Sequence, residues 1–221
     1  MLQQMSEQNR HGRGKDEPAC SLERHYRNMV GNKREYTIEI NGHRADGFLC
    51  SIDEALTARQ WDFVTLQQAS PLSYLIDSYE PYLQRLAEHV RCVCPKAKLL
   101  IHQTWAYETG SERIKAHGFE TYDEMFSHIR SNYEKAAELI QADGIVPSGE
   151  AFQCVLQSGV RNLHRGSFHA SYGIGRYLLA LVWYTHITGN DILHAMNFDR
   201  NNIVDKVSFS MTMTSSICPA A

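Results

Sequence analysis

The hydrophobic residues of this chain form short compact runs, which are separated by longer segments with a wider spacing. Three runs rich in aliphatic, β-branched or aromatic residues predict buried strands, at 62–67 (DFVTLQ), 97–104 (AKLLIHQT) and 144–147 (GIVP). A fourth run, 36–41, alternates apolar with polar residues and stops at an Asn-Gly pair, which predicts a strand that ends in a hairpin turn.

Between and after these runs, apolar residues recur at three- and four-residue spacings, the pattern of a helix with one buried face. Such segments begin near Pro81 and after Thr121, and a last predicted helix covers 172–188 and ends at Gly189. Thr121 and Glu124 form a capping-box signature, so this helix start is the clearest in the chain. Strands that alternate with long helices build βαβ units. The sequence therefore predicts an α/β fold with a parallel sheet and helices on both of its faces.

The composition is that of an ordinary globular protein, with 43% hydrophobic and 21% charged residues in a chain of 221. This length suits a single domain. Residues 1–18 are almost entirely polar, so they are predicted to be a disordered tail. The folded domain is expected at 19–190, and 191–221 is expected to be an irregular C-terminal extension.

Charge and hydropathy exclude several classes of partner. The net charge is −3 and basic residues form no long block, which argues against a nucleic-acid-binding protein. No apolar run approaches the roughly 20 residues of a membrane span, and no apolar leader segment is present, so no membrane association is expected. Six scattered cysteines in a chain of this size predict reduced thiols in a cytoplasmic protein.

Cofactor and metal motifs are missing from the sequence. No glycine-rich loop with the dinucleotide-binding spacing follows a predicted strand. The nearest approach to a zinc pattern is Cys92 and Cys94, which have no second pair at a suitable distance. His164 and His169 lie five residues apart without a neighbouring carboxylate. We therefore expect neither a cofactor nor a metal ion.

Polar side chains gather just after the predicted strands, where parallel sheets collect their ligands. These positions hold amide, imidazole, indole and carboxylate groups: Gln67, Gln68, His102, Gln103, Trp105 and Glu150. We predict that this rim binds a ligand. The alternative is that these groups are satisfied within the fold as ordinary loop residues.

Four sequence blocks together resemble a known superfamily. They are CSLERHYRN (20–28), WDFVTLQQAS (61–70), LLIHQTWAYETGS (99–111) and FHASYGIGRYLLALVWY (168–184), and IVPSGEAF (145–152) also fits. As a set they resemble the uncharacterised, esterase-like branch of the SGNH (GDSL-type) hydrolases. The resemblance implies a three-layer α/β/α fold with a flavodoxin-like sheet. It also implies hydrolysis of small-molecule or carbohydrate esters, often acyl groups on sugars.

The resemblance also implies roles for individual residues. A serine nucleophile, a histidine base and an aspartate form the catalytic triad of the family, and donor groups stabilise the oxyanion. His169 matches the base, and Gln67 is the best match for the oxyanion-hole amide, with Gln68 as the alternate. Three further residues match the rim of the following strand, and one matches a common carboxylate without an assigned role: His102, Gln103, Trp105 and Glu150.

The chain departs from the family pattern at three places. Gly166 stands three residues before His169, where the family has its aspartate. Pro18-Ala19 replaces the glycine of the second block, and no apolar strand with Gly-x-Ser precedes Cys20. We therefore expect the first strands of the family sheet to be missing, in a truncated or decayed relative with impaired catalysis. The strand at 62–67 would then be an open edge, which invites self-association.

Three functions remain open at this point. The first is an SGNH-type ester hydrolase that is catalytically impaired. The second is a non-catalytic remnant that binds a carbohydrate or a partner through Gln67, His102, Trp105 and His169. The third is a thiol–histidine hydrolase that uses Cys20 with His169.

Overall fold

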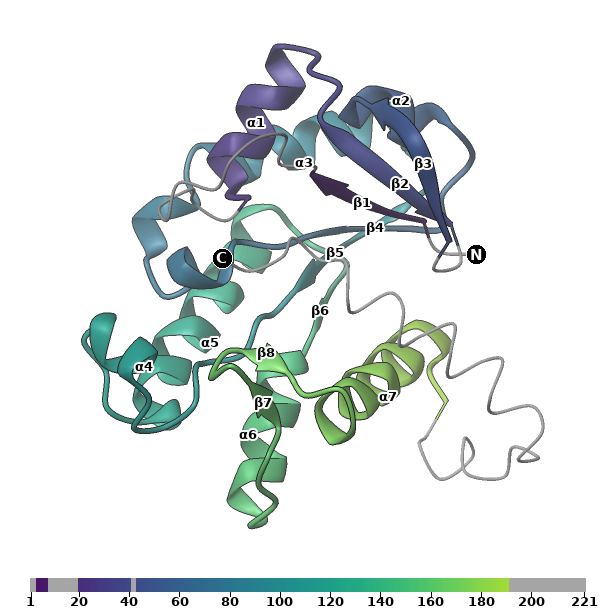
Figure 1. Cartoon of the computed structure of the whole chain (residues 1–221). Helices are drawn as coiled ribbons and strands as arrows, with labels where there is room; N and C mark the ends of the chain where they lie inside the picture. Colours follow the sequence, from purple (N-terminus) through teal and green to yellow (C-terminus); the bar gives the residue numbers. More distant parts are fainter. Residues whose placement is uncertain (1–2, 8–19, 41–42, 191–221) are drawn as a thin grey trace, which may run out of the picture.

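Figure 1 shows the chain as a computed structural model, which describes residues 3–7, 20–40 and 43–190. A parallel sheet of three strands lies at its centre: β4 (Phe63–Leu66), β5 (Lys98–His102) and β6 (Gly144–Val146), in the order β4-β5-β6. Both strand pairs are parallel, with Phe63 opposite Lys98 and Leu100 opposite Gly144. Among the described residues, β4 is hydrogen-bonded to β5 alone. The predicted α/β fold with a parallel sheet is confirmed.

Long helices connect and cover these strands. α3 (Tyr82–Val93) lies between β4 and β5 in the chain, and α5 (Tyr122–Leu139) lies between β5 and β6. The capping box of α5 is formed as the sequence predicts, because the Thr121 side chain accepts from Glu124 and the Glu124 side chain accepts from Thr121. The remaining helices are α1 (Leu22–Val30), α2 (Ile52–Thr57), α4 (Glu112–Ala116), α6 (Ser148–Gln157) and α7 (Ile174–Thr188), with short 3-10 turns η1 (Ser70–Leu72) and η2 (Ile76–Ser78).

The two faces of the parallel sheet pack against different helices. Successive side chains of a strand point to opposite faces. Leu99 and Ile101 of β5 belong to the larger core with α1, α3 and α5, whereas Leu100 packs with Val182 of α7 on the other face. The sheet therefore lies between two helical layers, as Figure 1 shows, and the three-layer α/β/α arrangement is confirmed.

A second sheet is antiparallel and consists of β1 (Gln3–Glu7), β2 (Tyr36–Ile40) and β3 (His43–Cys50), in that order. The strand predicted at 36–41 is confirmed as β2. Residues 3–7, in contrast, were predicted to be disordered and instead pair with β2. The physical reason is that the edge of β2 offers main-chain N–H and C=O groups, which a polar segment can pair with. The predictions for the rest of 1–18 and for 191–221 lie outside the described residues.

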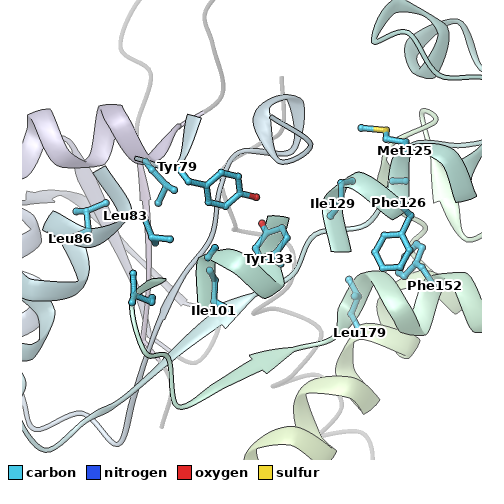
Figure 2. Close-up of a cluster of buried hydrophobic side chains, with 14 of the residues drawn as sticks. Tyr79, Leu83, Leu86, Ile101, Met125, Phe126, Ile129, Tyr133, Phe152 and Leu179 are labelled. Carbon is cyan, nitrogen blue, oxygen red and sulfur yellow. The ribbon is translucent and has the colours of Figure 1, made fainter. Parts of the chain in front are cut away.

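The core beside the site contains tightly packed aromatic rings, shown in Figure 2. Tyr79 and Tyr133 meet edge to face, with ring centroids 5.8 Å apart. Both phenols are fully buried and hydrogen-bonded: the Tyr79 hydroxyl donates to the Ser73 carbonyl at 2.9 Å, and the Tyr133 hydroxyl donates to the Gln68 carbonyl at 3.5 Å. Burial raises the pKa of Tyr133 to about 12. This core therefore fixes the main chain just after β4.

Candidate functional site

The predicted site residues follow the carboxyl ends of the parallel strands. Gln67 and Gln68 come directly after β4, and His102 is the last residue of β5. Gln103 and Trp105 come next, and Glu150 lies in the first turn of α6, after β6. The predicted base, His169, belongs to a small antiparallel hairpin of β7 (His164–Arg165) and β8 (His169–Ala170). In Figure 1 this hairpin lies near the end of β5, above α6.

Trp105 connects the rim of β5 to the hairpin. Its indole Nε1 donates a hydrogen bond of 2.7 Å to the carbonyl of Phe168, the residue before His169. The indole ring stacks on Phe152 of α6, with centroids 4.8 Å apart and planes 11° apart. The strand that carries His169 is therefore held against the parallel sheet, although Phe168 and Trp105 are far apart in the sequence.

Gln103 and Glu150 contact each other. The Glu150 amide N–H donates to Gln103 Oε1 at 3.1 Å, and Gln103 Nε2 donates to Glu150 Oε1 at 3.4 Å. The Arg130 guanidinium lies 3.7 Å from the same carboxylate. Gln103 is completely buried, so both ends of its side chain serve to attach the start of α6 to β5.

His102 lies inside the protein and does not line the solvent-facing rim. Its Nε2 is 2.8 Å from Ser148 Oγ, its ring packs against Trp183 with centroids 4.9 Å apart, and its side chain is buried. Desolvation, with a smaller contribution from His186 of α7, lowers the pKa of His102 to about 3. The imidazole is therefore neutral at physiological pH, and this Ser–His pair joins β5 to α6 beneath the surface.

The two glutamines after β4 differ in their use of hydrogen bonds. Gln68 is buried; its Oε1 accepts from the amides of Leu22 (3.1 Å) and Ala69 (2.9 Å), and its Nε2 donates to the Ser78 carbonyl at 2.8 Å. It therefore holds the start of α1 against the end of β4. Gln67 is half-buried, and its buried Oε1 has no hydrogen-bond partner in the described part of the structure. Of the two amide oxygens, that of Gln67 is the one free to accept a hydrogen bond from a ligand donor such as a sugar hydroxyl.

His169 is half-buried and leans on its neighbour, with the Phe168 and His169 ring centroids 3.9 Å apart. The guanidinium of Arg113 lies 3.9 Å from the centre of the Phe168 ring. The turn before His169 passes through Gly166 (φ +60°) and Ser167 (φ +67°), both in the left-handed region. Glycine adopts this conformation without strain, but it provides no carboxylate for the imidazole.

A family model described as a domain of unknown function, DUF4886, matches residues 17–214. The chain belongs to the DUF4886 family. It is similar to the crystal structure of a DUF4886 family protein from Bacteroides uniformis, with 30% identity and a TM-score of 0.75 over 90% of this chain and 79% of that one. A second similar structure is described as "a putative SGNH hydrolase", from Slackia heliotrinireducens. Here the identity is 24% and the TM-score 0.52, over 61% of this chain and 70% of that one. No curated protein matches.

The comparisons confirm the resemblance at the level of fold. This DUF4886 chain shares the α/β/α architecture of an SGNH-type structure. The roles of His169, Gln67 and the other rim residues stay predictions, because sequence identity at this level supports only the fold.

Cys20 contacts an imidazole that the sequence did not suggest. Its Sγ lies 3.1 Å from Nε2 of His25 in α1, and His25 Nδ1 lies 3.0 Å from the Tyr36 hydroxyl. The Tyr36 hydroxyl also accepts from Asn28 Nδ2 at 3.1 Å. The thiol of this DUF4886 chain thus belongs to a polar network between α1 and β2.

Three residues near His169 were missed by the sequence reasoning: Arg165, Tyr172 and Arg176. Both guanidinium groups contact the Tyr172 ring, at 4.5 and 4.4 Å from its centre. The sequence does contain a signal for an unpaired cluster of cations here, because residues 151–190 contain three arginines and no aspartate or glutamate. The absence of acidic residues around a predicted base stands out in a chain whose net charge is negative.

Two negative findings apply to the described residues. In that part of the chain, no three histidine, cysteine, aspartate or glutamate side chains are placed to hold a metal ion. None of its helices combines the length and the apolar character that a membrane span requires.

Proposed function

We propose that this chain binds acylated carbohydrate-type esters at the carboxyl edge of β4-β5-β6, as an SGNH-type ester hydrolase whose hydrolytic rate is impaired. One observation carries the proposal: the hydrogen bond from Trp105 to the Phe168 carbonyl, which joins the rim of the sheet to the strand of His169. The strand of the His169 imidazole is thereby attached to the edge of the sheet at which Trp105 follows β5 and Gln67 follows β4. Aromatic and amide groups at such an edge suit a sugar ester.

The proposed chemistry is acyl transfer with a histidine base. His169 takes a proton from the attacking hydroxyl group, which belongs to a serine in the family and to water in a residual reaction. It returns the proton to the leaving alcohol as the ester C–O bond breaks. The carbonyl oxygen gains negative charge in the transition state, and the Gln67 amide N–H groups are the proposed donors that stabilise it.

The proposed impairment follows from Gly166. In the triad, a carboxylate holds the imidazole in the correct tautomer and stabilises its charged form, and losing it costs about 10⁴ in rate. The position that holds this carboxylate in the family is here a glycine in a left-handed turn. A non-catalytic carbohydrate-binding or partner-binding protein is the second candidate, favoured by the same glycine.

Restoring the carboxylate tests the proposal. Aspartate tolerates the left-handed conformation, and a Cβ at Gly166 would meet only the Phe168 ring, at 4.0 Å. We expect Gly166→Asp to raise the hydrolysis of 4-nitrophenyl acetate about 100-fold or more, and the double variant with His169→Ala to lose this gain.

The matched control is Gly118→Asp, which adds the same charge at another positive-φ glycine with open space around it. Equal rates for the two aspartate variants would contradict the ester-hydrolase proposal. If an acetylated sugar still bound the protein in that case, the non-catalytic candidate would take its place.

A further inference from the structure

An exposed aromatic ring beside the hairpin holds two cations. The Tyr172 side chain is 61% exposed and lies between β8 and α7. The guanidinium carbons of Arg165 and Arg176 lie 4.5 and 4.4 Å from the centre of its ring. A guanidinium at this distance from an aromatic ring is attracted to the π-system. The two guanidinium carbons can therefore be no further apart than the sum of these two distances.

Neither cation is neutralised within the described part of the structure. Arg165 and Arg176 form no ion pair with a carboxylate there, and residues 151–190 contain no acidic residue at all. The Nε of Arg165 is buried and has no hydrogen-bond partner among residues 3–7, 20–40 and 43–190. A buried donor without an acceptor is unfavourable, and an anion at this guanidinium group would offset that cost.

The position of Arg176 adds to this imbalance. It lies in the first turn of α7, which holds no acidic residue, although the Gly175 and Arg176 amides there already donate to the side chain and the carbonyl of Ser171, each at 3.0 Å. Helix N-termini favour negative charge, so a cation there is unfavourable unless an anion lies nearby. The two guanidinium groups and the helix dipole of α7 therefore favour the same kind of ligand, with the guanidinium groups as the donors.

The cluster lies next to the predicted base. Arg165 of β7 is the direct cross-strand partner of His169 of β8. Side chains of directly opposed residues in an antiparallel pair project from the same face. A third cation, Arg113, packs on the ring of Phe168, the residue that precedes His169 in the sequence. An anion bound by Arg165 and Arg176 would thus lie beside the proposed ester site.

We propose that Arg165, Arg176 and Tyr172 form a subsite for an oxyanion, and that the ester bound by this chain is an acylated sugar with a negative charge. The ester part of this inference rests on the proposed function. Arginine binds carboxylate, sulfate and phosphate groups through paired N–H donors, and the Tyr172 ring holds the two guanidinium groups beside each other. The charged group sets specificity, while the acyl group lies toward His169.

Matched probes test the inference by calorimetric titration. The anionic probes are methyl O-acetyl-glucuronoside and methyl O-acetyl-glucoside 6-sulfate, and the neutral one is methyl O-acetyl-glucoside. We expect at least one anionic probe to bind about tenfold or more tightly than the neutral probe, with an advantage that shrinks as salt increases. Arg165→Gln and Arg176→Gln should each remove most of this advantage.

The control is Arg161→Gln, which removes the same charge from an exposed arginine whose guanidinium donates to the Leu156 carbonyl at 3.2 Å. It should leave the advantage of the anionic probe unchanged. Equal binding of all acetylated probes would overturn the oxyanion subsite and leave the ester proposal standing. Binding of unacetylated methyl glucuronoside as tightly as its acetylated form would support the subsite and count against the ester site. Absence of binding by every probe would overturn both.

Discussion

The imidazole of His102 illustrates how one buried residue acquires properties that its type does not predict. Its Nε2 lies 2.8 Å from Ser148 Oγ, its buried Nδ1 has no hydrogen-bond partner among the described residues, and burial lowers its pKa to about 3. In the unfolded chain the same group titrates near the ordinary value of about 6.5. Between these two values the unfolded state binds more protons than the folded state, so stability falls as the pH falls through this range.

This difference predicts a pH-dependent stability that a neutral side chain would remove. We expect the free energy of unfolding to gain at most about 1.4 kcal/mol per pH unit from His102 as the pH rises from 4 to 6. His102→Gln keeps a group that can bond to Ser148 but does not titrate, so this contribution should vanish in urea unfolding at several pH values. His128→Asn, at an exposed histidine, is the control. An unchanged pH slope in His102→Gln would show that the buried imidazole is not responsible.

At the scale of elements, the start of α6 depends on a close approach to β5. Its first three residues, Ser148, Gly149 and Glu150, contact the end of β5, the residues just after it or the first turns of α5. A Cβ on Gly149 would lie 2.3 Å from the Thr104 carbonyl oxygen and 2.2 Å from the Phe126 ring. The carbonyl belongs to the main chain and cannot move aside easily, so only glycine fits here.

Gly149→Ala should therefore destabilise the protein even though alanine is the better helix former. We expect a loss of about 1–3 kcal/mol or more in the free energy of unfolding, because α6 must shift away from β5. Ser158→Ala, at the exposed end of the same helix, should change stability by less than about 0.5 kcal/mol. Thermal or urea unfolding measures both. Equal stability of the two variants would mean that the helix start can relax without cost.

At the scale of the whole molecule, the site exists because a distant hairpin is attached to the sheet. The chain between Trp105 and Phe168 includes α4, α5, β6 and α6. The indole hydrogen bond and the stacking on Phe152 bring the hairpin back to the end of β5. The Glu108 amide donates to the Ser167 carbonyl at 2.8 Å and reinforces the attachment.

Trp105→Phe should loosen this attachment while it keeps an aromatic ring on Phe152. We expect faster amide hydrogen exchange in residues 164–171, and little change in β4, β5 and β6, because only one tertiary hydrogen bond is lost. Trp61→Phe is the matched control, since it removes an indole hydrogen bond to the Leu56 carbonyl at the opposite end of β4. Unchanged exchange in the hairpin of Trp105→Phe would show that other contacts hold it in place.

Much of the architecture was readable from local patterns. The strand runs, the capping box at Thr121 and the helix end at Gly189 agree with the structure because each depends on neighbours within a few residues. The pairing of residues 3–7 with β2 was not readable, because a polar strand of this kind is held by a partner about thirty residues away.

The sequence by itself determined the α/β architecture and the list of polar residues at the rim, because parallel strands end at one edge whatever their partners are. Only the tertiary structure decided how these residues are used. Gln68 and Gln103 form internal hydrogen bonds through both ends of their amides and His102 through Nε2, whereas Gln67 Oε1 has no partner in the described part of the chain. The gathering of Arg165 and Arg176 on Tyr172 was decided in the same way, since it depends on how the hairpin turns back toward α7. Burial and hydrogen bonding between segments distant in sequence cannot be read from local spacing.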